Sequence, residues 1–309
     1  MERNRIRFGL MTDIHQDLMY KASDRLQEFI DQSNKEDLDF IIQLGDFCFP
    51  VPENKSFLGI WQQFDGPNYH VLGNHDMDIC DKQSIMSYLG MKRNYYSFDC
   101  GDYHFVVLDA NFFRTDDHYV DYSFGNYFKH GDAVDNLTDE QLVWLKEDLS
   151  HTDKPTILFS HQSLEEKDVG MNVGIHNSGK LREILREANQ SAGFRKVIAC
   201  MNGHNHLDGV KVIDDIYFIH MNSISYYYLG PEFNSVRYSK EITEEHPILR
   251  QSVPYEEPIY AIITLEPGLL TIKGKESTYV GPDPNVIGHS NANAGHVVSA
   301  KISSRQLKF

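Results

Sequence analysis

The sequence predicts an α/β protein with a largely parallel β-sheet. Apolar runs of strand length alternate with segments whose apolar residues have helical spacing, which is the pattern of βαβ units. Several of these runs end in a polar turn that carries Asp, Asn or His, and functional side chains gather at the carboxyl ends of parallel strands. A chain of 309 residues has room for one large domain of this class or for two small ones.

The first part of the chain follows the order strand, helix, strand, helix, strand. Residues 6–13 (IRFGLMTD) form an apolar strand that ends in an aspartate, and residues 23–34 have the apolar spacing of a helix. Apolar strands at residues 38–46 (LDFIIQLGD) and 68–76 (NYHVLGNHD) follow, and each ends in a turn with glycine and aspartate. We therefore expect these three strands to lie parallel.

The remainder of the chain continues with strands and one clear amphipathic helix. The expected elements are a hairpin at 94–110, a capped helix at 135–152, strands at 154–162 and 195–206 that each lead into a histidine-bearing loop, antiparallel strands at 209–223 and a hairpin at 258–277.

No internal repeat or linker divides the chain, so we expect one main domain over residues 1–281. Two stretches within it are less regular, an aromatic-rich insertion at about 111–135 and a segment at about 226–258. The tyrosines 226–228 in the second stretch indicate β-sheet packing. Residues 282–309 are rich in Gly, Asn and Ser and are expected to form a C-terminal extension, either poorly ordered or docked.

Composition limits the kind of partner. The chain has 29 Lys and Arg against 45 Asp and Glu, a net charge of -16, which argues against binding to a nucleic-acid backbone. An anionic substrate would need positive charge supplied locally, and metal ions can supply it. The four cysteines are scattered and are expected to be buried thiols. No apolar stretch has the length of a membrane span and no signal peptide is visible, so a cytoplasmic location is expected; nothing predicts an oligomeric state.

Polar side chains follow five of the predicted strands and form a set of metal-ligand types. Carboxylate and amide oxygens together with imidazole nitrogens suit ions such as Mn, Fe, Zn, Ni or Co. The side chains are Asp13, His15, Asp46, Asn74, His75, Asp76, His161, His204 and His206.

The spacing of these residues has a physical reason. At positions i and i+2 of an extended segment the side chains point the same way, so Asp13 and His15 can hold one ion. His204 and His206 can share an ion in the same way or reach two adjacent ions. Asp46 is suited to bridging, because each of its carboxylate oxygens could take a separate metal. The neighbouring glycines allow tight turns and keep bulk away from the ions.

Each motif taken alone has a simpler interpretation. An Asp-x-His pair is common by chance, Gly-Asp is ordinary turn chemistry, and His161 could be a core histidine. Asn205 is interpreted as a spacer between two histidines. Five such elements in this order, each at the end of a strand, make a chance explanation of the whole set improbable.

Over roughly residues 6–225 these ordered motifs resemble the calcineurin-like metallophosphoesterase superfamily. The resemblance implies a two-sheet β-sandwich flanked by helices, a four-layer α/β/β/α fold, with two divalent metal ions such as Mn, Fe or Zn at the sheet edge. It implies His75 as a catalytic group oriented by Asp76. It also implies one ion held by Asp13, His15, Asp46 and His206 and a second held by Asp46, Asn74, His161 and His204.

The implied activity is hydrolysis of a phosphoester. Two cations about 3.5–4 Å apart can clamp a phosphoryl group and lower the pKa of a bridging water, which then attacks phosphorus. His75 would stabilise the developing charge or protonate the leaving oxygen, and Asp76 would favour the imidazolium.

Two positions at which this sequence differs from known branches of the superfamily limit the expected range of substrates. Phe49 stands where purple acid phosphatases have a tyrosine ligand, and no arginine follows Gly45-Asp46 as in the Ser/Thr protein phosphatases. The chain looks more like cyclic-nucleotide phosphodiesterases and manganese-dependent ADP-ribose/CDP-alcohol diphosphatases. We therefore expect a small phosphodiester or nucleotide-type pyrophosphate as substrate. A phosphomonoesterase and a catalytically silent metal-binding scaffold are the alternatives.

The aromatic-rich insertion is a candidate for substrate binding. Its side chains could stack on a nucleobase or clasp an organic leaving group, and the alternative is a packed surface loop. The residues considered are Arg114, His118, Tyr119, Tyr122, Tyr127 and His130, of which Arg114, His118 and Tyr122 are the chosen candidates.

Overall fold

Two six-stranded β-sheets lie face to face in the computed structural model, which describes residues 5–116, 118–167, 174–290, 292–293 and 295–309. The first sheet has the spatial order β18 (Arg305–Lys308), β15 (Leu269–Gly274), β14 (Ala261–Glu266), β1 (Ile6–Met11), β2 (Phe40–Gln43) and β3 (Asn68–His70). The second has the order β10 (Gly209–Ile213), β11 (Ile216–His220), β9 (Val197–Asn202), β8 (Thr156–Ser160), β5 (Tyr103–Val107) and β4 (Tyr96–Cys100).

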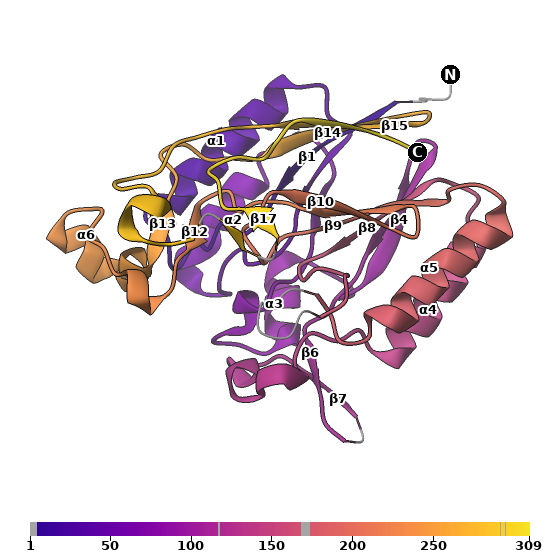
Figure 1. Ribbon diagram of the computed structural model, residues 1–309, viewed down its shortest axis with the longest axis horizontal. Coiled ribbons are helices and arrows are strands. Elements are labelled where there is room, and N and C mark those ends of the chain that lie inside the picture. Colours follow the sequence, from indigo (N-terminus) through magenta and orange to yellow (C-terminus); the bar gives the residue numbers. More distant parts are fainter. Residues whose placement is uncertain (1–4, 117, 168–173, 291, 294) are drawn as a thin grey trace.

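Helices cover the outer face of each sheet, which completes four layers (Figure 1). One apolar cluster joins the first sheet to α1 (Ala22–Lys35), α2 (Lys55–Trp61) and α3 (Lys82–Leu89). Another joins the second sheet to α4 (Asp139–Ser150) and α5 (Ser178–Ala192), which lie side by side. The α/β/β/α sandwich implied by the family resemblance is therefore confirmed.

The main core lies between the sheets because strand residues alternate between two faces. Phe8 of β1 stacks on Phe40 of β2 with ring centroids 4.7 Å apart. The same ring meets Phe105 and Phe159 of the second sheet edge-on at 5.7 and 5.8 Å. These aromatic contacts join the two sheets at their centre, below the edge that carries the polar turns.

The expected βαβ order is confirmed, since β1, β2 and β3 are parallel. The expectation of one largely parallel sheet is too simple. After β3 the chain crosses to the second sheet, where β5, β8, β9 and β11 are parallel and an antiparallel strand lies at each edge. The hairpins expected at 94–110 and 258–277 form β4–β5 and β14–β15.

The C-terminal residues are part of the sandwich. β18 pairs with β15 in antiparallel fashion, and Leu307 packs against the main core. Pairing removes the exposed edge that β15 would otherwise present. A domain boundary at residue 281 would therefore take a strand away from the first sheet. Residues 291 and 294 of the expected extension lie outside the described residues.

Short elements build the two less regular stretches. The stretch at about 111–135 contains β6 (Phe112–Arg114), β7 (Tyr119–Asp121) and the 3-10 helices η3 (Asn126–Lys129) and η4 (Gly131–Ala133); residue 117 lies outside the described residues. The stretch at about 226–258 contains β12 (Tyr226–Tyr228), η5 (Pro231–Phe233), α6 (Lys240–Glu245), η6 (Pro247–Gln251) and β13 (Ser252–Pro254). The remaining elements are η1 (Pro52–Asn54), η2 (His75–Met77), η7 (Pro284–Ile287), β16 (Ala292–Asn293) and β17 (His296–Val297).

A buried lysine ties the aromatic-rich insertion to the core. Lys82 of α3 lies 2.7 Å from carboxylate oxygens of both Asp109, at the end of β5, and Asp121 of β7. Its ammonium group also lies 3.5 Å from the ring centroid of Phe112. The insertion is thereby held beside the polar edge of the sandwich. In the described part of the chain, no helix has both the length and the apolarity needed to cross a membrane.

Candidate metal centre

The turns that follow β1, β2, β3, β8 and β9 meet at one edge of the sandwich. Backbone hydrogen bonds join the first two turns, since Asp13 N donates to Gly45 O at 3.0 Å and His15 N to Asp46 O at 3.0 Å. The third turn is joined to them because His75 N donates to Asp46 Oδ1 at 2.8 Å. Turns distant in the sequence are thus fixed relative to one another.

Five side chains at this edge come from residues with left-handed backbone, a conformation that costs a non-glycine residue about 1–2 kcal/mol. Such strain persists where the surrounding structure enforces it, and it clusters at functional sites. Asp13, His15, Asp46, His204 and His206 have φ angles of 54°, 50°, 53°, 65° and 50°.

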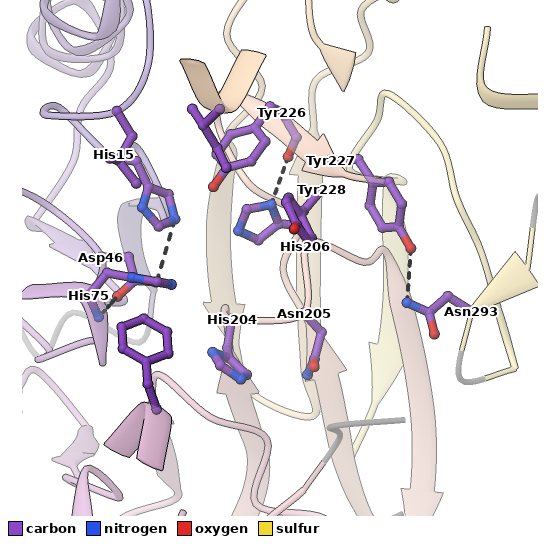
Figure 2. A pocket seen from close by; sticks show the side chains of 13 residues that line it. His15, Asp46, His75, His204, Asn205, His206, Tyr226, Tyr227, Tyr228 and Asn293 are labelled. Carbon is purple, nitrogen blue, oxygen red and sulfur yellow. Dashed lines mark hydrogen bonds and ion pairs between the residues drawn. The ribbon is translucent and has the colours of Figure 1, made fainter. Parts of the chain in front are cut away.

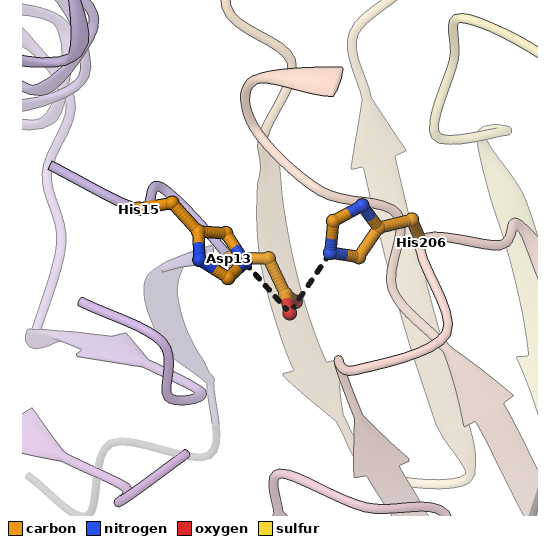
Figure 3. A group of neighbouring side chains, drawn as sticks. All are labelled: Asp13, His15 and His206. Carbon is orange, nitrogen blue, oxygen red and sulfur yellow. Dashed lines mark hydrogen bonds and ion pairs between the residues drawn. The ribbon is translucent and has the colours of Figure 1, made fainter. Parts of the chain in front are cut away.

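The first group of potential ligands is Asp13, His15 and His206 (Figure 3), whose ligand atoms lie within 4.8 Å of one another. His206 Nε2 is 3.2 Å from Asp13 Oδ1, and His15 Nε2 is 4.0 Å from the same oxygen. His15 Nε2 is buried and has no hydrogen-bond partner among the described residues. A buried nitrogen lone pair that faces a carboxylate without bonding to it is suited to a cation.

The second group is Asp46, His161 and His204, again with ligand atoms within 4.8 Å of one another. His161 Nε2 lies 3.2 Å from Asp46 Oδ2, 3.2 Å from His204 Nδ1 and 3.1 Å from Asn74 Oδ1. Four potential donors therefore converge, and they are the residues expected from the sequence for one ion.

Asp46 lies between the two groups. Its Oδ2 is 3.4 Å from His15 Nε2 and 3.2 Å from His161 Nε2, so one oxygen faces both groups. Its Oδ1 accepts the backbone hydrogen bond from His75. The expectation that each oxygen takes its own metal stays a prediction, because an oxygen that accepts one hydrogen bond keeps a second lone pair.

Backbone carbonyls orient two of the imidazoles. Nδ1 of His161 donates to Leu44 O at 2.7 Å, and Nδ1 of His206 donates to Tyr226 O at 2.9 Å. A proton held on Nδ1 leaves Nε2 for a cation, which is the usual arrangement of metal-binding histidines.

At most of the potential ligands, the electrostatics of this edge favour the protonation state that binds a metal ion. Burial raises the pKa of Asp13, but the imidazoles of His206 and His161 outweigh it and the pKa falls to about 2. Burial lowers the pKa of His15 to about 3, and burial together with His161 lowers that of His204 to about 4. Carboxylates and neutral imidazoles are the forms that bind metals.

His161 differs from the other imidazoles. Burial lowers its pKa, but the carboxylates of Asp46 and Asp13 outweigh burial and raise the pKa to about 10. A divalent cation held by these carboxylates competes with the His161 proton, so metal binding releases protons.

Two glycines allow the turns to approach closely. A Cβ on Gly73 would lie 2.2 Å from Asp46 N, and a Cβ on Gly203 would lie 2.0 Å from Thr12 Oγ1. The expectation that glycine keeps bulk away from this edge is confirmed at these two positions.

His75 is held by an unexpected partner. Its Nδ1 lies 2.8 Å from Asp78 Oδ2, which is reachable because the 3-10 turn η2 brings residues i and i+3 together. Tyr127 of the insertion donates to Asp78 Oδ1 at 2.5 Å and accepts from Asn74 Nδ2 at 3.2 Å. Burial lowers the pKa of His75, but Asp46 and Asp78 outweigh it and raise the pKa to about 9.

Asp76 does not orient His75 as expected. Its carboxylate accepts hydrogen bonds from the backbone N–H groups of Gly73, Asp46 and Phe47 at 2.8, 3.2 and 2.6 Å. It therefore joins two of the ligand-bearing turns. Burial and the nearby Asp46 raise its pKa to about 7.

The model of the calcineurin-like phosphoesterase family matches residues 6–208. The chain belongs to the calcineurin-like phosphoesterase family. A manganese-dependent ADP-ribose/CDP-alcohol diphosphatase from Oryza sativa subsp. japonica is 28% identical over 230 residues, covering 60% of this chain and 69% of the rice protein. This phosphoesterase is accordingly a hydrolase that acts on phosphoesters.

Solved structures share the fold at lower identity. A dimetal phosphatase from Danio rerio aligns with a TM-score of 0.59 at 16% identity, over 89% of this phosphoesterase and 98% of that chain. GAP50, the anchor in the inner membrane complex of Plasmodium, aligns with a TM-score of 0.56 at 16% identity, over 99% and 89% of the two chains. One fold thus carries a phosphatase and an anchor, so function has to be argued from the site.

A cavity of about 510 Å³, called here the central cavity, opens above the two ligand groups (Figure 2). Its floor includes His15, Asp46, His75, His204 and His206. Its walls come from parts of the chain outside the main strands, namely Leu18, Phe128, Asn205, Tyr226, Tyr227, Tyr228, Ile248 and Asn293. Its size lies in the range of small-molecule sites.

The three residues expected to bind substrate are not in the central cavity. Arg114 lines a separate hollow of about 440 Å³, and exposed His118 contacts Thr115. Tyr122 is 1% exposed, and its hydroxyl donates to Asp135. The insertion reaches the site instead through Tyr127 and Phe128, because η3 turns the chain back toward His75 after the hairpin.

Several residues of the site were missed from the sequence. Asp78 could have been found from its i+3 spacing to His75. Tyr127 was among the residues of the insertion considered for substrate binding, but its contact with His75 and Asp78 was not expected. Tyr226 and Tyr227 do pair with β13, as expected for β-sheet packing, yet they also line the cavity. Asn205, interpreted as a spacer, lines it too.

Proposed function

We propose that this phosphoesterase hydrolyses a phosphodiester or pyrophosphate bond of a small nucleotide-type substrate with two divalent cations. The observation that carries the proposal is the convergence of two ligand groups on the floor of the central cavity beside His75. The rice relative, a manganese-dependent diphosphatase of ADP-ribose and CDP-alcohols, supports this substrate class and favours manganese.

The proposed ligand sets are those implied by the family resemblance, and the distances between side chains support them. One cation would be held by Asp13, His15, Asp46 and His206, and the other by Asp46, Asn74, His161 and His204. The orphaned Nε2 of His15 and the shared Oδ2 of Asp46 fit this assignment. When bound, two such cations supply Lewis-acid polarisation of the phosphoryl group and an activated water.

We propose His75 as the catalytic acid. Its Nδ1 contacts Asp78, which leaves Nε2 for the substrate, and its raised pKa keeps it protonated at neutral pH. During hydrolysis the attacking water gives one proton to solvent and its oxygen bonds to phosphorus, while the bond from phosphorus to the leaving oxygen breaks and its electron pair goes to that oxygen. His75 gives its Nε2 proton to that oxygen. Asp78 and Tyr127 act through His75 as positioning residues.

Charge favours a phosphodiester over a phosphomonoester. Among the described residues that line the central cavity there is no lysine or arginine. A phosphomonoester carries nearly two negative charges at neutral pH, because its second pKa is about 6, whereas a diester carries one. The smaller charge suits a site whose cations and His75 are the positive groups.

The test is turnover by protein reconstituted with manganese. We expect faster release of p-nitrophenolate from bis-p-nitrophenyl phosphate than from p-nitrophenyl phosphate, and little release after chelation. Faster turnover of the monoester would favour a phosphomonoesterase. Two bound metals without turnover of any phosphoester would favour the catalytically silent scaffold.

A further inference from the structure

The central cavity extends to both sides of the ligand groups. In Figure 2, His15, Asp46 and His75 lie on one side, and Asn205, Tyr227 and Asn293 lie on the other. Phe128 belongs to the His75 side, because their ring centroids are 5.9 Å apart. A phosphoryl group above the ligand groups therefore has room for one substituent on each side.

Asn205 offers a hydrogen-bond donor on the side away from His75. Its backbone N–H bonds to Gly203 O at 2.7 Å, which completes the tight turn between His204 and His206. Its Nδ2 is buried and has no partner among the described residues, although the side chain lines the cavity. A buried amide donor without a hydrogen-bond partner is unfavourable, and a ligand that accepts a hydrogen bond from it removes this cost.

Asn293 offers an acceptor on the same side. Its Nδ2 donates to the hydroxyl of Tyr227 at 2.9 Å, which leaves the amide oxygen available for a ligand. Tyr226, Tyr227 and Tyr228 form the adjoining wall, and aromatic faces suit a planar ring. This side thus offers a hydrogen-bond donor, an acceptor and an aromatic wall. None of the described residues that line it is a lysine or arginine that could bind a further phosphate.

We propose that Asn205 and Asn293 bind the nucleoside that remains esterified to the phosphate product, while the other group leaves past His75 and Phe128. The assignment of sides follows from chemistry, because the acid must face the leaving oxygen. This inference rests on the proposed function. It makes the retained group the one selected by hydrogen bonds, whereas the leaving group lies beside the exposed ring of Phe128.

Two esters with the same leaving group test the proposal. Thymidine 5′-(p-nitrophenyl phosphate) and methyl p-nitrophenyl phosphate both release p-nitrophenolate, and they differ only in the retained group. We expect kcat/KM of the manganese-loaded protein to be about 10- to 100-fold higher for the thymidine ester, the effect of one or two hydrogen bonds plus ring contacts.

Variants then assign this preference to residues. Asn205→Ala and Asn293→Ala should each reduce the ratio between the two esters about tenfold, mainly through KM of the thymidine ester. Phe128→Ala should change both esters in the same proportion, because they share a leaving group. Asn34→Ala, an exposed asparagine of α1, is the matched control and should leave the ratio unchanged.

Binding of thymidine 5′-monophosphate, measured by calorimetry, gives a readout independent of turnover and should weaken in both asparagine variants. Metal content is measured for each protein because Asn205 lies between two potential ligands, whereas Asn293 is remote from them in sequence. A ratio near one in the unmodified protein, or an unchanged ratio in both asparagine variants, overturns this inference alone. Failure to hydrolyse either ester overturns the proposed function.

Discussion

Two buried histidines, each beside two carboxylates, show how differently this chain uses the same residue type. His104 of β5 places Nδ1 2.7 Å from Asp99 and Nε2 2.8 Å from Asp148, so both nitrogens are hydrogen bonded. His15 has a buried Nε2, 3.4 Å from Asp46 Oδ2, to which no residue in the described part of the chain is hydrogen bonded.

The electrostatic consequences are opposite. Burial lowers the pKa of His104, but its hydrogen bonds to Asp148 and Asp99 outweigh burial and raise it. At His15 burial prevails and lowers the pKa to about 3. A complete cluster stabilises the fold, whereas an incomplete one lowers stability until a ligand completes it. Of these two histidines, the one with incomplete hydrogen bonding is the one that lies among the potential metal ligands.

The largest effect is expected from Asp46→Asn, because both ligand groups share this carboxylate. Metal affinity should fall by at least about 100-fold, and activity should disappear with it. Metal content after dialysis and turnover of bis-p-nitrophenyl phosphate are the measurements. A fully active variant with two bound metals would remove Asp46 from its shared position.

A smaller loss of activity is expected from His75→Gln. Its kcat should fall by about 10²–10⁴-fold, the usual contribution of acid–base catalysis, with the metal content unchanged. Loss of metal in this variant would instead identify His75 as a ligand.

Two neighbouring aspartates sharpen the comparison further. Asp78→Asn should reduce kcat by about 10- to 100-fold, as when the outer partner of a functional side chain is lost, with little change in melting temperature.

Asp76→Asn should lower the free energy of unfolding by about 2–3 kcal/mol, because its carboxylate accepts three backbone hydrogen bonds. Urea unfolding and steady-state kinetics of the Asp78→Asn and Asp76→Asn variants show which aspartate supports catalysis and which stabilises the fold. The opposite pattern would restore Asp76 as the partner of His75.

The smallest effect is expected at the complete cluster. Since the pKa of His104 is raised in the folded state, its stabilisation is fully present below the unfolded value of about 6.5 and is lost as pH rises through the folded value. His104→Gln should cost about 1 kcal/mol at pH 6, a value reduced for the exposure of Asp99, and less at pH 9.

Urea unfolding of both proteins at pH 6 and pH 9 measures this difference. Manganese-dependent turnover at neutral pH is the control and should be unchanged. A difference in stability that grows with pH would contradict the assigned charge of His104.

Much of the metal centre was predictable because each ligand lies in a short local motif at the end of an apolar strand. Asp13 with His15 and His204 with His206 are pairs whose spacing carries a geometric reason. The aromatic-rich insertion shows where such reasoning stops. Arg114, His118 and Tyr122 were chosen for their chemistry, but the path of the hairpin and η3 brought Phe128 to the cavity and Tyr127 to His75 instead.

The sequence by itself determined the βαβ order and the set of metal-ligand types, because periodicity and strand-end motifs are local properties. Only the tertiary structure decided which atoms face one another. It made one oxygen of Asp46 common to both ligand groups, brought Tyr127 to His75 and Asp78, and placed Asn205 and Asn293 on one side of the cavity. These relations join residues from separate turns, and they depend on the packing of two sheets, which no local pattern encodes.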